Sequence, residues 1–282
     1  MPSIPYDCSR TALYQPATRP TLFVAGTSYA PTLIGIECAR LAYLRSESSH
    51  DDAARLAEAL ARIGFAAPQP FVGAFDAQAF GSYRASDRLA LIAFRGTEPD
   101  RVGDLGTDAD VLPVAWPESA GKVHQGFARS LRSLRGAIDD WLGTLTARDA
   151  LLLCGHSLGG ALATLGASIW KPRDLVTIGS PRVGDADFVA TIAAAAVTRI
   201  VDCCDVVTTL PPELTGYRHV GSAVYIDRDG NLPVGADDAF VRGDHLKARA
   251  DYTLHCAWRS GAVLLRDLAD HAPINYARAM FP

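Results

Sequence analysis

A serine with the local sequence of a catalytic nucleophile stands at position 157. It lies in Gly155-His156-Ser157-Leu158-Gly159-Gly160, a G-x-S-x-G pattern. The apolar run Ala150–Cys154 before it predicts a strand, and the residues after it, Leu158–Trp170, predict a helix. A sharp turn between a strand and a helix exposes a serine hydroxyl, and glycines let the backbone pass close to itself. Serine is also a preferred helix N-cap, but the flanking elements favour a nucleophile.

The start of the predicted helix would also supply a site for developing negative charge. The first N–H groups of a helix lack partners within the helix and lie at the positive end of its dipole. The N–H of Leu158, the residue after the serine, is therefore the expected oxyanion donor. His156 is adjacent to Ser157, so we expect it to point elsewhere and to be structural.

A serine nucleophile of this kind needs an acid and a histidine base, which follow it in the order Ser, Asp or Glu, His. A strand is predicted over Thr198–Cys203, and Asp205 comes directly after it. The carboxyl ends of strands in open α/β sheets are where sites lie, so Asp205 is the expected acid. Asp202 is the alternative, within the predicted strand.

The base should come after one further strand, which leaves three of the seven histidines: His245, His255 and His271. His255 lies in an apolar stretch, residues 252–258, which favours a buried structural histidine. His245 and His271 both remain candidates on these grounds.

The rest of the chain predicts an α/β fold. Short apolar strands separated by helices indicate a mostly parallel central sheet with helices on both faces, in one domain over residues 1–282. Residues 1–30 predict an irregular lead-in. The remaining predicted helices are Thr32–Arg45, Asp52–Ile63, Phe127–Leu145 and Ala186–Ala196, followed by a closing helical region; the remaining strands are Gln78–Tyr83, Leu89–Phe94, Asp174–Ile178, Ala223–Asp227 and Leu232–Val234.

Composition narrows the classes of function. The chain has 282 residues, of which 49% are hydrophobic and 21% charged, with a net charge of -4. This balance allows a large core and gives no reason to expect nucleic acid as a partner. No stretch approaches the roughly 18 apolar residues of a membrane span. The N-terminus does not resemble a secretory signal, so we expect a cytoplasmic location, with secretion by another route left open.

The six cysteines show no metal-ligand spacing. We therefore expect reduced thiols, no metal and no cofactor. Cys203 and Cys204 are adjacent, and on a strand their side chains would point to opposite faces.

Several segments resemble class 3 lipases, a family of the α/β-hydrolase superfamily. They occur in the family's order over about residues 78–276, whereas the first 75 residues match loosely. These segments are the nucleophile motif, Phe94-Arg95-Gly96-Thr97, Val123-His124-Gln125-Gly126-Phe127, Gly179-Ser180-Pro181-Arg182-Val183-Gly184, Leu210-Pro211-Pro212 and Gly216-Tyr217-x-His219.

The resemblance implies an α/β-hydrolase fold and a serine hydrolase that cleaves carboxylic esters. Asp205 fits the family's acid in D-x-V-x-x-L-P-P, and His271 fits the base in its terminal D-H-x-x-x-x-Y block. The resemblance implies Thr97 as the second oxyanion donor, and Asp108 or Asp110 as the carboxylate that holds its hydroxyl.

In the family, the stretch corresponding to residues 98–116 carries a lid. Fungal relatives have an amphipathic lid helix with aromatic residues, whereas this stretch carries five acids, a proline and two glycines among its first thirteen residues. Such a lid has little apolar face to place on a lipid interface. We expect transient lipid contact, weak interfacial activation and a preference for short or medium acyl chains, unless Val114-Ala115-Trp116 docks on lipid instead.

The leading hypothesis is a lipase or esterase acting on acylglycerols or related esters. Phospholipase A1, feruloyl esterase and acyltransferase activities use the same scaffold and triad, and fold alone does not choose among them. An α/β-hydrolase without catalysis that serves as a binding module is the alternative from another class.

Overall fold

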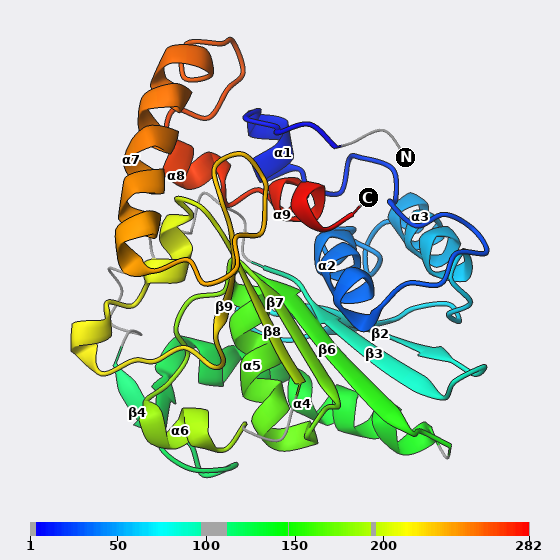
Figure 1. Ribbon diagram of the computed structural model, residues 1–282. Coiled ribbons are helices and arrows are strands. Elements are labelled where there is room, and N and C mark those ends of the chain that lie inside the picture. The colour runs from blue at the N-terminus through cyan, green and yellow to red at the C-terminus, as the bar shows by residue number, and fades with distance from the viewer. Residues whose placement is uncertain (1–3, 97–111, 146, 193–195, 282) are drawn as a thin grey trace.

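A seven-stranded sheet in the order β1-β2-β3-β6-β7-β8-β9 forms the centre of the protein (Figure 1). The computed structural model describes residues 4–96, 112–145, 147–192 and 196–281. The strands from β3 to β9 run parallel, and β1 and β2 are antiparallel at one edge. Their bounds are β1 Gln69–Val72, β2 Gln78–Arg84, β3 Leu89–Phe94, β6 Ala150–His156, β7 Asp174–Ile178, β8 Ala196–Asp202 and β9 Ala223–Ile226. The predicted α/β-hydrolase class, with its mostly parallel sheet, is confirmed.

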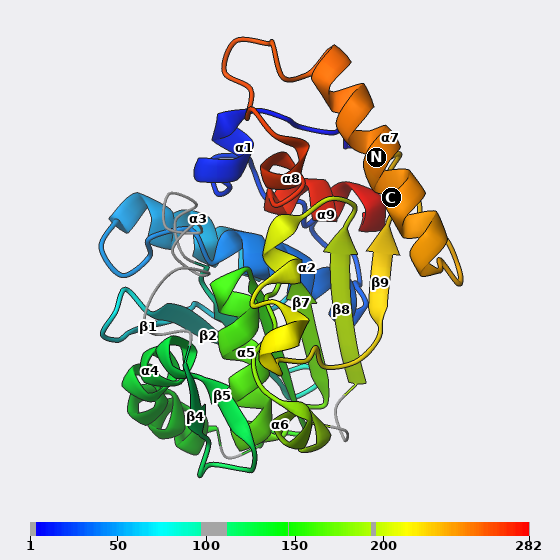
Figure 2. The same cartoon turned by 90° about the vertical axis from the view of Figure 1, so that its left-hand side faces the viewer.

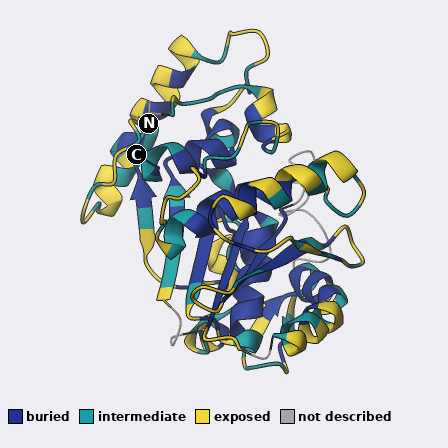
Figure 3. Cartoon of the chain, turned by 90° about the vertical axis from the view of Figure 1, so that its right-hand side faces the viewer, coloured by how far each residue is buried: buried dark blue, intermediate teal, exposed yellow. Residues whose placement is uncertain are grey.

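Helices cover both faces of the sheet. Two separate apolar cores lie against these faces, one under α2, α3 and α9, the other under α4 and α5 (Figures 1 and 2). The central strands β3 and β6 are buried along their whole length, as the dark blue sheet in Figure 3 shows, which explains why their sequences are apolar without alternation. The longer helices are α2 Pro31–Leu41, α3 His50–Ala61, α4 Gln125–Thr144, α5 Leu158–Trp170, α7 Asp238–His255 and α9 Pro273–Met280; the short ones are α1 Arg10–Tyr14, α6 Ala186–Ala190 and α8 Arg266–Ala269.

Three predicted segments differ from the structure in their secondary structure. Residues 232–234 do not form a strand, because the chain turns back where the Asp227 carboxylate accepts the N–H groups of Asp229 and Asn231. Helix α6 ends at Ala190, well before the predicted Ala196. The expected irregular lead-in contains α1, whose first turn is capped by the hydroxyl of Ser9.

A small ribbon of β4, Pro113–Ala115, and β5, Lys122–His124, leads into α4. The ring of Trp116 after β4 is 1% exposed, and its indole N–H donates to the Ser168 hydroxyl at 2.9 Å. Trp116 is therefore a core residue, which counts against the alternative that residues 114–116 dock on lipid. None of the described helices is long and apolar enough to cross a membrane.

A buried ion pair on α2 fastens the lead-in to the body. Glu37 and Arg40 are both fully buried and bond at 2.7 Å. The Arg40 guanidinium also donates to the carbonyls of Pro16, Arg19 and Pro20, and Glu37 accepts the N–H of Leu22. These bonds satisfy both charges, so removal of either partner leaves the other buried and uncompensated.

We expect Arg40→Ala to lower the unfolding free energy by about 3–5 kcal/mol, because the Glu37 carboxylate loses its counter-charge in the core. Glu58→Ala is the matched control: Glu58, on α3, is 69% exposed and pairs with Arg62, just past the helix end, so its loss should cost less than about 1 kcal/mol. Urea unfolding of the two variants measures the difference. Equal losses would contradict this account of the pair.

Candidate active site

Ser157 occupies the turn between β6 and α5 in a backbone conformation that side chains rarely adopt, with φ 56° and ψ −128°. The turn is tight enough to exclude side chains at its glycines. A Cβ on Gly155 would lie 2.2 Å from the carbonyl carbon of Gly159, and a Cβ on Gly159 would lie 2.1 Å from the Phe94 carbonyl oxygen. The motif therefore forms the strained strand-to-helix turn that its spacing predicts.

Asp205 and His271 lie in contact although 66 residues separate them. Asp205 Oδ2 lies 2.8 Å from His271 Nδ1, and both residues are 1% exposed. Asp205 follows the carboxyl end of β8, where its Oδ1 accepts the Val207 N–H and so caps a short 3-10 helix, Val206–Thr209. His271 precedes α9. The structure thus brings the predicted acid and the predicted base into hydrogen-bond contact.

Tyr276 on α9 provides a second donor to the same carboxylate. Its hydroxyl bonds to Asp205 Oδ2, and its ring is fully buried. Burial, reinforced by the negative charge of Asp205, raises the pKa of Tyr276 well above its ordinary value, so the hydroxyl keeps its proton. Tyr276 belongs to the D-H-x-x-x-x-Y block, but the sequence did not assign it a place at the site.

His156, which precedes Ser157 in the sequence, contacts the backbone of His271. Its Nε2 lies 2.8 Å from the His271 carbonyl oxygen and its Nδ1 2.7 Å from the Tyr43 hydroxyl. The carbonyl can only accept, so Nε2 carries the proton and Nδ1 accepts from Tyr43. Burial, with His271 close by, lowers the pKa of His156 well below its ordinary value and keeps the ring neutral. His156 is structural, as expected, and its partner is the backbone of the base.

In a serine triad the proton would pass between Ser157 Oγ and His271 Nε2, and both atoms are buried. Within the described part of the chain, neither Ser157 Oγ nor His271 Nε2 has a hydrogen-bond partner, and Ser157 is 0% exposed. The N–H of Leu158 stands at the first position of α5, where no carbonyl of the helix can accept it. Thr97, the other predicted oxyanion donor, and the candidate carboxylates Asp108 and Asp110 lie outside the described residues.

The alternative acid and bases lie elsewhere. Asp202 is the last residue of β8, and burial beside Asp270 raises its pKa well above the ordinary range, so it favours the neutral form. His245 is on α7, half-buried, with its Nε2 unpartnered among the described residues. His255, interpreted from the sequence as a core histidine, is exposed at the end of α7, where its apolar neighbours Leu254 and Trp258 are exposed as well.

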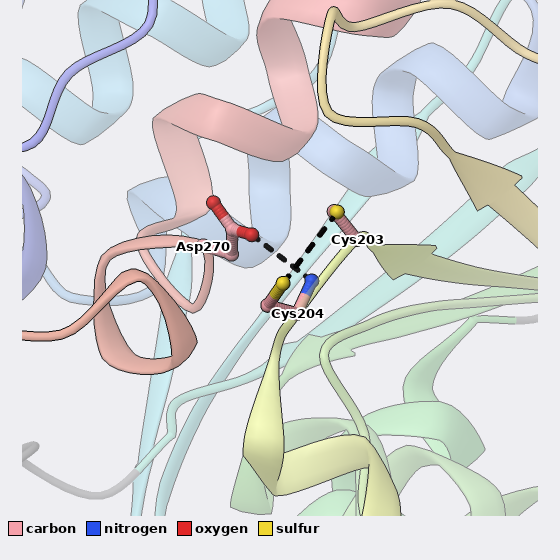
Figure 4. Close-up of side chains that lie close together, drawn as sticks. All are labelled: Cys203, Cys204 and Asp270. Carbon is pink, nitrogen blue, oxygen red and sulfur yellow. Dashed lines mark hydrogen bonds between the residues drawn. The ribbon is translucent and has the colours of Figure 1, made fainter. Parts of the chain in front are cut away.

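Asp270 joins the segments that carry the acid and the base. Asp270 directly precedes His271. Its Oδ2 accepts the N–H of Cys204, the residue before Asp205, at 3.0 Å (Figure 4). Arg266 Nε and the Tyr6 hydroxyl donate to the same carboxylate. This bond ties the backbone next to the acid to the backbone next to the base.

Asp270, Cys203 and Cys204 also hold potential metal-ligand atoms within 4.8 Å of one another. The Asp270 carboxylate is already occupied by Arg266, Tyr6 and the Cys204 N–H. Hydrogen bonding to Cys204, together with burial, raises the pKa of the Cys203 thiol, which disfavours the thiolate that binds metal. The cluster is therefore a hydrogen-bonded structural contact near the site.

The sheet order, the strained turn at Ser157 and the Asp205–His271 pair are features of the α/β-hydrolase fold. Residues 91–215 match the family Lipase (class 3), and the resemblance inferred from the sequence is thereby confirmed. The match includes Ser157 and Asp205 but ends before His271 and Tyr276.

Curated relatives and solved structures agree with this family. Lipase A of Sodiomyces alcalophilus is 29% identical over 57% of this chain and 48% of its own length. The secreted mono- and diacylglycerol lipase 1 of Fusarium solani is 36% identical over 37% of this chain and 34% of its own. The chain thus spans about half the length of the first relative and about a third of the second. Lipase II from Rhizopus niveus shares the fold, with a TM-score of 0.59 at 24% identity over 70% of this chain and 79% of that one.

We expect Tyr276→Phe to lower kcat by about tenfold with little change in KM, because Asp205 loses one donor and orients His271 less firmly. Tyr225→Phe is the matched control, since its hydroxyl donates to another buried carboxylate, Asp244, at 2.8 Å. Kinetics on a soluble ester compare the two variants. Equal kcat values for Tyr276→Phe and Tyr225→Phe would show that the bond to Asp205 has no part in positioning the base.

The buried histidine His219 makes the stability of the protein depend on pH. Burial lowers the pKa of His219 from 6.5 to about 3, while its Nε2 bonds to the Thr208 carbonyl oxygen. The unfolded chain then binds a proton that the folded chain does not, so the stability from this group is present above about pH 6.5 and lost as the pH falls.

The unfolding free energy should therefore decrease by up to about 1.4 kcal/mol per pH unit between about pH 6 and 4 because of His219 alone. Urea unfolding at several pH values measures this slope. His219→Gln should reduce the slope, and the exposed His50→Gln should not. A slope in His219→Gln as steep as in the parent protein would contradict the assignment.

Proposed function

We propose that the protein is a serine hydrolase that cleaves carboxylic esters, with acylglycerols or related lipid esters as its substrates. The contact between Asp205 and His271, within a fold that places Ser157 on a strained turn, is the observation that carries the proposal. The class 3 lipase match over residues 91–215 and the relatives named lipases support the same chemistry.

In the proposed reaction, His271 Nε2 removes the proton from Ser157 as its Oγ attacks the ester carbonyl carbon. Asp205 holds Nδ1 protonated and stabilises the imidazolium that forms. Collapse of the tetrahedral intermediate expels the alcohol, which takes the proton from His271, and leaves an acyl-enzyme on Ser157. Water, deprotonated by His271, then attacks the acyl carbon; collapse of this second tetrahedral intermediate releases the acid and Ser157, whose Oγ takes the proton back from His271.

The tetrahedral intermediate carries its negative charge on the former carbonyl oxygen. The N–H of Leu158 at the start of α5 would donate to this oxygen, together with the positive end of the helix dipole. The backbone N–H of Thr97 would be the second donor, as the family resemblance implies.

The polar composition of residues 98–116 supports short or medium acyl chains. The burial of Trp116 removes the aromatic residue of this stretch from any lipid contact. The acids that remain gain nothing from transfer into a lipid phase, so a lid formed by this stretch would respond weakly to an interface.

Initial rates on p-nitrophenyl esters from acetate to palmitate test this proposal, with Ser157→Ala as the blank. We expect a rate that peaks at short or medium chains and disappears in the blank. A peak at palmitate would contradict the argument from the polar lid. A rate equal to the blank on every ester would instead favour a binding module without catalysis.

A further inference from the structure

Helix α7 presents an apolar face to solvent. Leu246, Ala250 and Leu254 follow each other at four-residue steps, and Trp258 continues the series just past the helix end. The side chains of Leu246, Leu254 and Trp258 are 70%, 67% and 73% exposed, and Ala250 is exposed as well. We call these four residues the α7 stripe. Four-residue steps place them along one side of the helix.

The opposite side of α7 is firmly attached to the protein. Asp244, Ala248 and Tyr252 are its buried residues. Asp244 Oδ2 accepts the Tyr225 hydroxyl and the Arg228 N–H, and the Tyr252 hydroxyl donates to the Val263 carbonyl at 2.6 Å. The inner face therefore fixes the helix, and packing within the chain does not require the stripe to be apolar.

Basic side chains flank the α7 stripe. Arg242 lies one turn before Leu246, Lys247 follows it, and Arg259 follows Trp258; all three are exposed. Arg249 is paired with Asp267 at 2.6 Å. The exposed acids of this segment are Asp237, Asp238 and Asp251: Asp237 caps the start of the helix through the Phe240 N–H, Asp238 lies in its first turn, and Asp251 faces Arg228.

The helix stands at the end of the molecule where the proposed chemistry occurs. Figure 2 shows β8 and β9 with their arrowheads toward α9 and α7. Ser157 and Asp205 follow the same, carboxyl ends of β6 and β8. Figure 3 shows the yellow, exposed outer side of α7 at the edge of the molecule. A surface resting on this helix would therefore lie near the carboxyl ends that carry the site.

We propose that the α7 stripe, with Arg242, Lys247 and Arg259, is the surface by which this protein adsorbs to an anionic lipid–water interface. Leucines and a tryptophan on one face with basic residues beside them are the features of a helix that lies in the plane of an interface. The Trp258 ring suits the headgroup level, where an aromatic ring with one polar atom is stabilised. This inference rests on the proposed lipid substrate, and it assigns interface binding to α7 rather than to the lid.

Binding is measured by flotation with phosphatidylcholine vesicles, with and without phosphatidylglycerol. We expect the double variant Leu246→Ser, Leu254→Ser to lower the partition coefficient by at least about tenfold, because two apolar side chains leave the lipid contact. Val72→Ser is the matched control, since Val72 is 59% exposed on β1, at the opposite edge of the sheet. Binding should be stronger with phosphatidylglycerol and weaken with added salt.

Trp258 reports the contact directly. Its fluorescence should shift to the blue on vesicles, and Trp258→Phe should remove the shift while vesicle binding largely remains. Unchanged binding in the double variant, or a shift that persists in Trp258→Phe, would overturn the proposal. Self-association through α7 in ultracentrifugation, without vesicle binding, would also overturn it in favour of a second copy of the chain.

The experiment separates this proposal from the proposed function. Vesicle binding needs no turnover, so a protein inactive on every ester would still bind if the α7 stripe is the docking surface. In an active protein, the double variant should keep its rate on soluble p-nitrophenyl acetate and lose rate on an emulsified ester such as tributyrin. Equal rates of parent and double variant on the emulsion would contradict the role of the stripe.

Discussion

The hydrogen bond between Asp205 and His271 depends on most of the fold. Parallel pairing of β6, β7 and β8 brings the residues after β6 and β8 to one end of the sheet. His271 directly precedes α9, and α9 packs on α2 over one face of the sheet. This packing brings His271 to the same end. If either packing changed, the acid and the base would separate, since 66 residues of chain join them.

Several buried groups keep this contact in one geometry. Tyr276 holds the carboxylate, His156 holds the backbone of His271, and Asp270 ties the chain beside the acid to the chain beside the base. The donors Tyr276 and His156 stay neutral through burial, so they orient the pair without adding charge beside it. The negative charge of Asp205 is then balanced by hydrogen bonds in the resting protein and by the imidazolium when His271 takes up a proton.

The sequence was most informative where a local pattern decides the structure. The predicted bounds Leu158–Trp170 and Asp174–Ile178 agree with α5 and β7. Both elements are largely buried, so their apolar residues contrast with the polar turns on either side and mark where each element begins and ends. The edge strand β1 was missed: its four residues contain a proline and one buried side chain. His255 was misread because the apolar residues near it lie on two sides of α7: Tyr252 is buried, whereas Leu254 is exposed beside His255.

The contacts that organise the site were beyond local patterns. His156 and His271 are 115 residues apart, and Tyr276 and Asp205 71 apart, so no periodicity predicts that they meet. The order Ser, Asp, His limited the candidates, and the choice of His271 over His245 rested on the family resemblance. The assigned roles of Ser157, Asp205 and His271, and of Thr97 outside the described residues, stay predictions.

Labelling with a fluorophosphonate probe, followed by peptide mass spectrometry, tests them most directly. The account predicts one label, on Ser157, absent in Ser157→Ala and formed far more slowly in His271→Gln; a label on another residue, or an unchanged rate in His271→Gln, would contradict it.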